Sequence, residues 1–263
     1  MNPPPHVTPA PGTKVISFDL DDTLIRGPFS QVLRDAMVAV TDSEDEATAL
    51  RQQMNQRHRE LLDDDRLEAY DWHQLVAETV GERDPGFDML DRLEQYAADN
   101  LTQVLHEDTG TLLGDLRSHG WTTIILTNGW RRYQEPILRH AGLLTAVDEL
   151  IASDDVGAPK PAEEMFLRAR GGASVHVHVG DRIDHDIVGG NRSGASTVLL
   201  RRDAPEDPAQ VEDYLLERYR AQSTPESDLP YARPALVTPH LSDVVAWVTD
   251  PATVLPTVDA VRS

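Results

Sequence analysis

Two acidic side chains that could act together follow the first apolar run of this sequence. Residues 15–18 form a short strand-like run, and Asp19 and Asp21 come directly after it. Alternate residues of an extended chain point to the same face, and open parallel sheets bind their ligands beyond the carboxyl ends of their strands. Paired carboxylates in that place could bind a cation, attack an electrophile or exchange a proton. Acids after a strand also often only cap the next helix, so the pair needs support from the rest of the chain.

Two further strand-like runs, 121–126 and 175–179, end in polar residues of the kinds that such acids would require. A lysine lies between them, just ahead of the helical stretch 162–170. The residues that these segments contribute are Thr127, Asn128, Lys160, Asp181 and Asp186.

In this order the signals resemble the haloacid dehalogenase superfamily of phosphohydrolases. The shared pattern is Asp-x-Asp-x-Thr, a Thr or Ser that closes a strand, a Lys, and Gly-Asp-x-x-x-x-Asp, and the match runs from about residue 15 to 200 and resumes near 234. The resemblance implies an α/β fold whose core is a Rossmann-like parallel sheet. It also implies a hydrolase of the phosphatase branch, with an inserted all-helical cap of the first (C1) type.

The resemblance further implies a role for each residue. Asp19 would attack phosphorus to form an aspartyl phosphate, and Asp21 would protonate the leaving alcohol and then activate water. Thr127, Asn128 and Lys160 would bind the phosphate, with Lys160 also compensating the acids.

Magnesium is the cofactor that the resemblance implies. Asp19, Asp181 and the backbone carbonyl of Asp21 would be its ligands, and Asp186 would orient them or a metal-bound water. A hard cation suits this chemistry because a phosphate ester cannot approach uncompensated carboxylates.

Several subclasses are distinguished by single residues. Dehalogenating relatives carry a non-acidic residue where Asp21 stands, so the acid favours phosphate. Phosphonate hydrolysis would use a cap lysine, and no lysine lies between Asp21 and Asn128. A phosphomutase like β-phosphoglucomutase, and a non-catalytic binding or regulatory protein on the same fold, both remain open. The leading prediction is a phosphatase for a small phosphorylated metabolite.

Strand and helix patterns alternate along most of the chain, which favours a parallel sheet wound with helices. The exception is 28–105, where helical spacing recurs in 29–40, 43–62, 67–80 and 87–101 without a strand-like run, and which we therefore assign to the cap. The core would comprise 14–27 and 106–250, including an acidic insertion at 203–233, a helix at 133–140 with Pro136 in its first turn and an edge strand at 235–237. Residues 1–13 are expected to be flexible and 251–263 loose.

Composition restricts the partners. The chain has 263 residues, 40% of them hydrophobic, no cysteine and a net charge of -21. Such a charge disfavours nucleic acid and anionic membranes. No apolar run is long enough to span a bilayer and the start has no signal-peptide pattern, so we expect a cytoplasmic protein that binds a small-molecule phosphate ester. Its anionic substrate would need local positive charge, for which Lys160 and the arginines 26, 131, 132 and 182 are candidates.

Two further groups have competing interpretations. His176 and His178 alternate on one strand and could bind zinc, but hydrogen-bonded structural histidines are the favoured interpretation. Tyr70, Trp72 and His73 could line the substrate cleft, and burial within the helices would explain them equally well.

Overall fold

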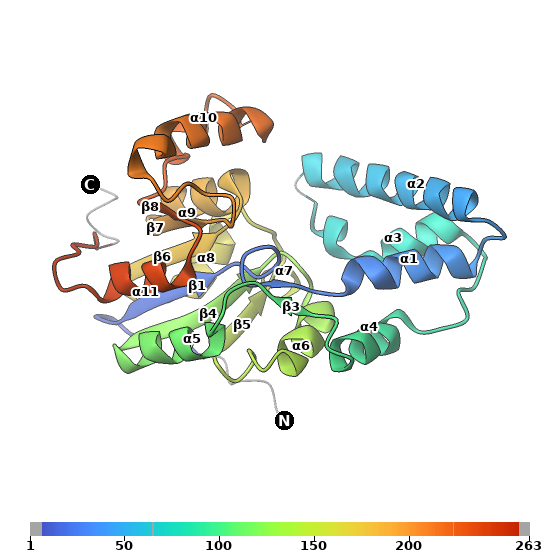
Figure 1. Cartoon of the computed structure of the whole chain (residues 1–263), viewed down its shortest axis with the longest axis horizontal. Helices are drawn as coiled ribbons and strands as arrows, with labels where there is room; N and C mark the ends of the chain where they lie inside the picture. The colour runs from blue at the N-terminus through green and yellow to red at the C-terminus, as the bar shows by residue number, and fades with distance from the viewer. Residues whose placement is uncertain (1–6, 65, 223, 258–263) are drawn as a thin grey trace.

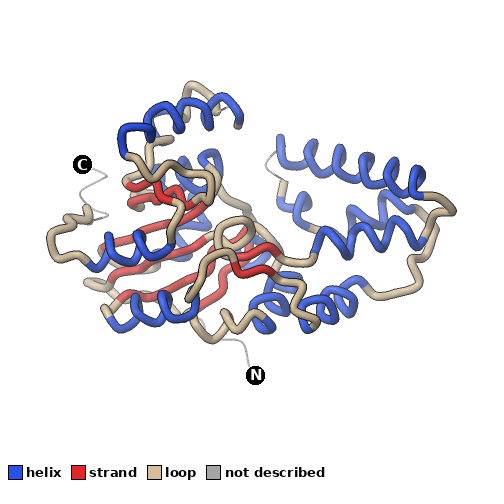
Figure 2. Tube along the Cα trace, in the orientation of Figure 1, coloured by secondary structure: helices blue, strands red, loops and turns tan. Residues whose placement is uncertain are grey.

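The computed structural model describes residues 7–64, 66–222 and 224–257, and the core of these residues is a six-stranded sheet. Figures 1 and 2 show this sheet with helices around it. The strand order is β5-β4-β1-β6-β7-β8 and every pairing is parallel. The predicted α/β class with a parallel core is confirmed. The strands are β1 (Lys14–Phe18), β4 (Trp121–Thr127), β5 (Glu149–Ala152), β6 (Val175–Gly180), β7 (Ser196–Leu200) and β8 (Leu236–Thr238).

The position of β1 at the centre of the sheet determines where a site can form. The chain runs from β1 to β4 and β5 on one side and then crosses to β6, β7 and β8 on the other. Phe18 pairs with both Ile125 and Val179, so the residues after these three strands emerge at the same edge. Ligands of open α/β sheets bind at such a reversal of strand order.

Both faces of the sheet are buried, which explains the near-continuous apolar strands. Alternate residues pack on opposite sides, because successive side chains of a strand point to opposite faces. Val15 and Ile124 pack in one cluster with Phe166 of helix α8 (Glu163–Arg170), whereas Ile16 lies in a second cluster with Leu113 of helix α5 (Thr109–Ser118). The helices that follow the sheet strands are α5 (Thr109–Ser118), α6 (Arg131–His140), α7 (Ser153–Val156), α8 (Glu163–Arg170), α9 (Val188–Arg192), α10 (Val211–Ala221) and α11 (Leu241–Thr249).

Among the described residues, four α-helices lie between the two-residue strands β2 (Ile25–Arg26) and β3 (Gln103–Val104), beside the carboxyl edge of the sheet (Figure 1). We call them the helical insertion; they are α1 (Phe29–Ala39), α2 (Glu44–Asp63), α3 (Trp72–Val80) and α4 (Met89–Ala98). The prediction that no strand lies in 28–105 is wrong at β3, which pairs antiparallel with β2. Two exposed residues are too few to display strand alternation.

Capping residues explain where these helices begin and end. Ser43 Oγ accepts from the Glu46 N–H at 3.2 Å at the start of α2, and Gly81 ends α3 with a φ of 65°. The predicted single helix 67–80 is divided, because Asp71 accepts from the Gln74 N–H and caps α3. A 3₁₀ turn, Leu67–Tyr70, precedes it.

The placement of Pro136 differs from the prediction. Helix α6 begins at Arg131, two residues earlier than expected, so Pro136 lies in its second turn and not in its first. Its missing N–H removes a bond within the helix.

The acidic segment after β7 packs on the core. Helix α10 lies within this segment, and its Leu215 is buried in a cluster with Ile183 and Leu199. Residues 7–13 also make contacts, since the Gly172 N–H donates to the Pro9 carbonyl at 2.9 Å. The remainders of the predicted terminal segments, 1–6 and 258–263, lie outside the described residues. In the described ranges, no helix is both long and apolar enough to cross a membrane.

Candidate active site

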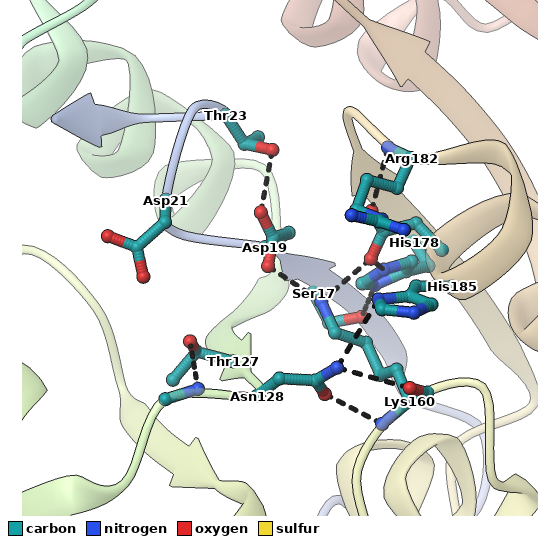
Figure 3. A network of polar contacts seen from close by, with 12 residues as sticks. Ser17, Asp19, Asp21, Thr23, Thr127, Asn128, Lys160, His178, Arg182 and His185 are labelled. Atoms are coloured by element: carbon teal, nitrogen blue, oxygen red, sulfur yellow. Dashed lines mark hydrogen bonds and ion pairs between the residues drawn. The ribbon is translucent and has the colours of Figure 1, made fainter. Parts of the chain in front are cut away.

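The first two acids diverge because the chain turns back immediately after β1. The N–H groups of Leu24 and Ile25 both donate to the Leu20 carbonyl, which closes the turn. Asp19 is buried at the strand end, and its Oδ2 accepts from the Thr23 hydroxyl at 2.8 Å. Asp21 points from the same turn toward the side of β4 (Figure 3).

Lys160 reaches the acids from the loop before α8. Its Nζ lies 2.7 Å from Asp19 Oδ1 and 2.7 Å from Asp186 Oδ1, and the side chain is almost fully buried. Burial alone would lower the pKa of Lys160, but the charges of Asp186 and Asp19 outweigh it and raise that pKa. Lys160 is therefore a fixed cation between the two acids.

Asp186 is the most constrained of the acids. Besides contacting Lys160, Asp186 accepts from the Arg182 N–H at 3.0 Å and contacts His178 Nε2 at 3.0 Å. Burial acts to raise the pKa of Asp186, but Lys160 and His178 lower it overall. Asp186 is thus held as a carboxylate.

The two strand histidines extend this network into the sheet. His178 Nδ1 and His176 Nε2 each lie 2.8 Å from the Ser17 hydroxyl on β1. Burial lowers the pKa of both rings, in the case of His176 to about 3, so both are neutral. These contacts support the structural interpretation of the pair over the zinc interpretation.

Asp181 follows β6 and completes an acidic group. One carboxylate oxygen from each of Asp19, Asp181 and Asp186 lies within 4.8 Å of the others. Burial and the neighbouring charges of Asp19 and Asp186 raise the pKa of Asp181, even though Arg201 Nη1 lies 3.2 Å from its Oδ2. A bound cation would relieve this repulsion, so the oxygen ligands fit a hard divalent metal.

The end of β4 brings the predicted phosphate-binding residues to the same place. Thr127 is buried, and its hydroxyl accepts from the Gly129 N–H at 3.1 Å. The Asn128 amide accepts from the Lys160 N–H at 2.6 Å and donates to the Lys160 carbonyl at 3.1 Å and to the Tyr70 hydroxyl at 2.8 Å. The Asn128 side chain therefore fixes the lysine loop on the strand end.

Sequence reasoning missed Gln134, which lies on α6 and reaches Asp21. Its Nε2 donates to Asp21 Oδ2 at 2.6 Å. Burial and the Asp19 charge raise the pKa of Asp21 to about 7, although part of its side chain faces solvent. Gln134 belongs to no motif, so only the helical phase of α6 relative to β4 could have indicated it.

The acids, Thr127, Asn128 and Lys160 all line one cavity of about 380 Å³. The helical insertion supplies much of the opposite wall, through Phe29, His58, Leu62, Tyr70 and Trp72. Two of the three predicted cleft residues thus line it. The third, His73, instead contacts the Tyr133 hydroxyl through its ring and its backbone N–H.

Of the four candidate arginines, Arg182 lines this cavity. Each of the four pairs with a carboxylate, as in the Arg182–Asp184 and Arg131–Asp155 contacts. Because a carboxylate partly neutralises each of them, these arginines contribute little net positive charge to the site.

Comparison with known families agrees with this arrangement. Residues 13–194 match the family model described as haloacid dehalogenase-like hydrolase, and 157–244 match a second described as HAD-hydrolase-like. The chain belongs to the haloacid dehalogenase-like hydrolase family. The predicted family and hydrolase class are confirmed.

Individual relatives cover most of the chain. A glyceraldehyde 3-phosphate phosphatase from Methanopyrus kandleri is 27% identical over 234 residues, which are 79% of this chain and 94% of the relative. The structure of an HAD phosphatase from Thermococcus onnurineus has a TM-score of 0.68 at 24% identity and covers 92% of this chain and 100% of its own. An L-2-haloacid dehalogenase from Xanthobacter autotrophicus has a TM-score of 0.59 at 18% identity, covering 91% and 100%. At these identities the two structures establish the fold.

Proposed function

We propose that this hydrolase is a magnesium-dependent phosphatase that acts on a small phosphorylated metabolite through an aspartyl phosphate on Asp19. The observation that carries the proposal is the acid at Asp21, which shares a cavity with the Asp19–Lys160 pair. A halide leaving group needs no proton, whereas an alkoxide does. Relatives named as phosphatases of small phosphorylated sugars support the same activity.

In the first step an Asp19 carboxylate oxygen attacks phosphorus while the bond from phosphorus to the ester oxygen breaks. Asp21 gives its proton to the leaving oxygen, and its raised pKa favours this resting proton. In the second step Asp21 takes a proton from water, whose oxygen attacks the phosphorus of the aspartyl phosphate. Asp19 is released as a carboxylate together with inorganic phosphate.

Lys160 and Thr127 would contact the phosphoryl oxygens during both steps. Lys160 is held next to Asp19, so its charge needs no rearrangement when the phosphoryl group arrives. Asn128 supports this indirectly through its two bonds to the lysine backbone. A direct contact of Asn128 with phosphate stays a prediction.

Magnesium fits the acidic group that Asp19, Asp181 and Asp186 form. Asp19 and Asp181 would hold the cation, and Asp186, which already contacts Lys160, would orient them or a metal-bound water. The Asp21 carbonyl as a further ligand stays a prediction. When bound, the cation supplies positive charge that neutralises the phosphoryl oxygens.

The helical insertion would act as the cap domain, with 28–105 as its extent. Its aromatic residues face the acids across the cavity, and a volume of about 380 Å³ suits a small ester. Selectivity between substrates would therefore reside on this wall.

Release of inorganic phosphate from aryl phosphate, sugar phosphates and nucleotides, with Mg²⁺ or with EDTA, tests the proposal. We expect Mg²⁺-dependent hydrolysis that Asp19→Asn abolishes while the chain stays folded, because the change removes the nucleophile and little volume and Lys160 keeps its contact with Asp186. Phosphate transfer to a second sugar without release would indicate a mutase. Undiminished turnover by Asp19→Asn would refute the mechanism, and no turnover by the native chain would favour a binding protein.

A further inference from the structure

Gln134 is buried, and apolar packing does not account for an amide side chain at this position. Its Nε2 donates to Asp21 Oδ2 at 2.6 Å. Among the described residues, no other side chain forms a hydrogen bond with the Asp21 carboxylate, so this bond fixes its orientation. The direction of Asp21 thus depends on a residue of α6.

The other amide atom of Gln134 lacks a partner. Its Oε1 is buried and finds no hydrogen-bond partner among the described residues. A buried acceptor without a partner destabilises a fold, and an apolar side chain of similar length would avoid that cost. Stability alone therefore favours a residue such as Met at this position.

The absence of a side chain at Gly129 leaves space for the Gln134 amide. A Cβ at position 129 would lie 2.0 Å from Gln134 Nε2 and 2.8 Å from its Cδ. Gly129 is not among the described glycines with a positive φ, so space and not backbone conformation accounts for the missing side chain. The loop after β4 therefore leaves room for the amide that helix α6 places against Asp21.

We infer that Gln134 is a positioning residue that directs the acid–base carboxylate of Asp21, and that Gly129 provides the space for it. This inference rests on the proposed phosphatase function. The amide N–H occupies a lone pair of Oδ2, so the transferable proton sits on Oδ1. The carboxyl group then presents that proton to the ester oxygen as its bond to phosphorus breaks.

The test compares Gln134→Met with the native chain on two esters, p-nitrophenyl phosphate and glycerol phosphate. The phenolate leaves without help, whereas the alkoxide needs a proton. We expect kcat for glycerol phosphate to fall on the order of 10- to 100-fold, as for loss of a hydrogen bond to a charged group, and kcat for the aryl ester to fall by a smaller factor. Thermal stability in EDTA should stay the same or rise.

Gly129→Ala provides a second route to the same displacement. Its methyl group must push the flexible end of Gln134 away, so it should reproduce the selective loss on glycerol phosphate. The double variant with Gln134→Met should be no worse than either single change, because both remove one contact. Gln74→Met is the matched control, since Gln74 is exposed and donates to Glu78 at 2.7 Å away from the cavity. It should leave both activities unchanged.

The outcomes separate the inference from the proposed function. An equal loss on both esters, or a loss of stability in parallel with activity, overturns the role of Gln134 while the phosphatase proposal stands. Additive effects of Gly129→Ala and Gln134→Met would likewise overturn the role of Gly129. If the native chain releases phosphate from neither ester with Mg²⁺, the proposed function fails and the inference with it.

Discussion

Lys160 governs the charge balance among the side chains of the site. It contacts Asp19 and Asp186, and all three groups are nearly inaccessible to water. A buried ion pair that loses one partner leaves an uncompensated charge, which costs about 3–5 kcal/mol. The histidines behind Asp186 are neutral, and a protonated histidine there would compete with Lys160 for the Asp186 carboxylate.

His176 should make the fold sensitive to acid. Its pKa is lowered to about 3 by burial, His178 and Arg170, whereas the unfolded chain binds a proton with the ordinary histidine pKa of about 6.5. Between these values the unfolded state holds the extra proton, so stability is lost as the pH falls, by up to about 1.4 kcal/mol per pH unit. Urea unfolding at pH 6.5 and 5 in EDTA should therefore show a loss of unfolding free energy that is smaller by about 1.6 kcal/mol in His176→Gln.

The exposed His119 provides the control for this experiment. His119→Gln should keep the native pH dependence. A His176→Gln profile that coincides with the native profile would show that other groups cause the acid sensitivity.

The helical insertion is joined to the core in two ways, by side-chain contacts at the site and by the chain itself. Tyr70 accepts from Asn128, and Asp71 pairs with Arg132, so side chains join it to the site. The chain itself connects it through β2 and β3, which pair with each other and not with the main sheet. Such a pair of short strands is a natural place for hinge motion.

Closure on a phosphate mimic should therefore be visible at β2 and β3. With Mg²⁺ and beryllofluoride, we expect hydrogen exchange to slow in Ile25–Arg26 and Gln103–Val104 and in the Tyr70 turn, because these segments become more ordered when the cap closes. Peptides from β7 should not change. The response should be absent in Asp19→Asn, which lacks the carboxylate that binds the mimic. Unchanged exchange at both strands in the native chain would indicate a rigid, open site.

The elements also show what the sequence could predict and what it could not. Long periodic segments such as α2 and buried runs such as β4 were predictable because apolar spacing reflects burial. The motif order located Asp19, Thr127, Lys160 and Asp181 because strand ends converge at one edge. Gln134 was not predictable, since its approach to Asp21 depends on where α6 begins, and the expected start was two residues late.

The whole molecule is strongly acidic, and the cavity shares that sign. The chain carries a net charge of -21, while the cavity is lined by five aspartates but only Lys160 and Arg182 as permanent cations among the described residues. Arg182 is partly neutralised by Asp184. An anionic ester therefore approaches against the field of the protein until it is within a few ångströms of the site.

Added salt should relieve this repulsion. The Debye length falls from about 30 Å at 0.01 M to about 10 Å at 0.1 M, so distant charges are screened more than adjacent ones. At saturating Mg²⁺ we expect kcat/KM to rise modestly with KCl when binding limits the rate. Melting curves over the same range would control for effects on folding. A steep fall in kcat/KM would mean that cations near the cleft dominate the field.

The burial of Lys160 gives the molecule a chemical reporter of its own state. The sequence contains two lysines, and Lys14 lies at the opposite end of β1 from the acids, partly accessible and over the Trp121 ring. An amine-directed reagent would meet Lys14 in every conformation but could acylate Lys160 only after its ion pairs open. The ratio of the two acylated peptides would then measure how often the site exposes its cation, with Lys14 as an internal standard.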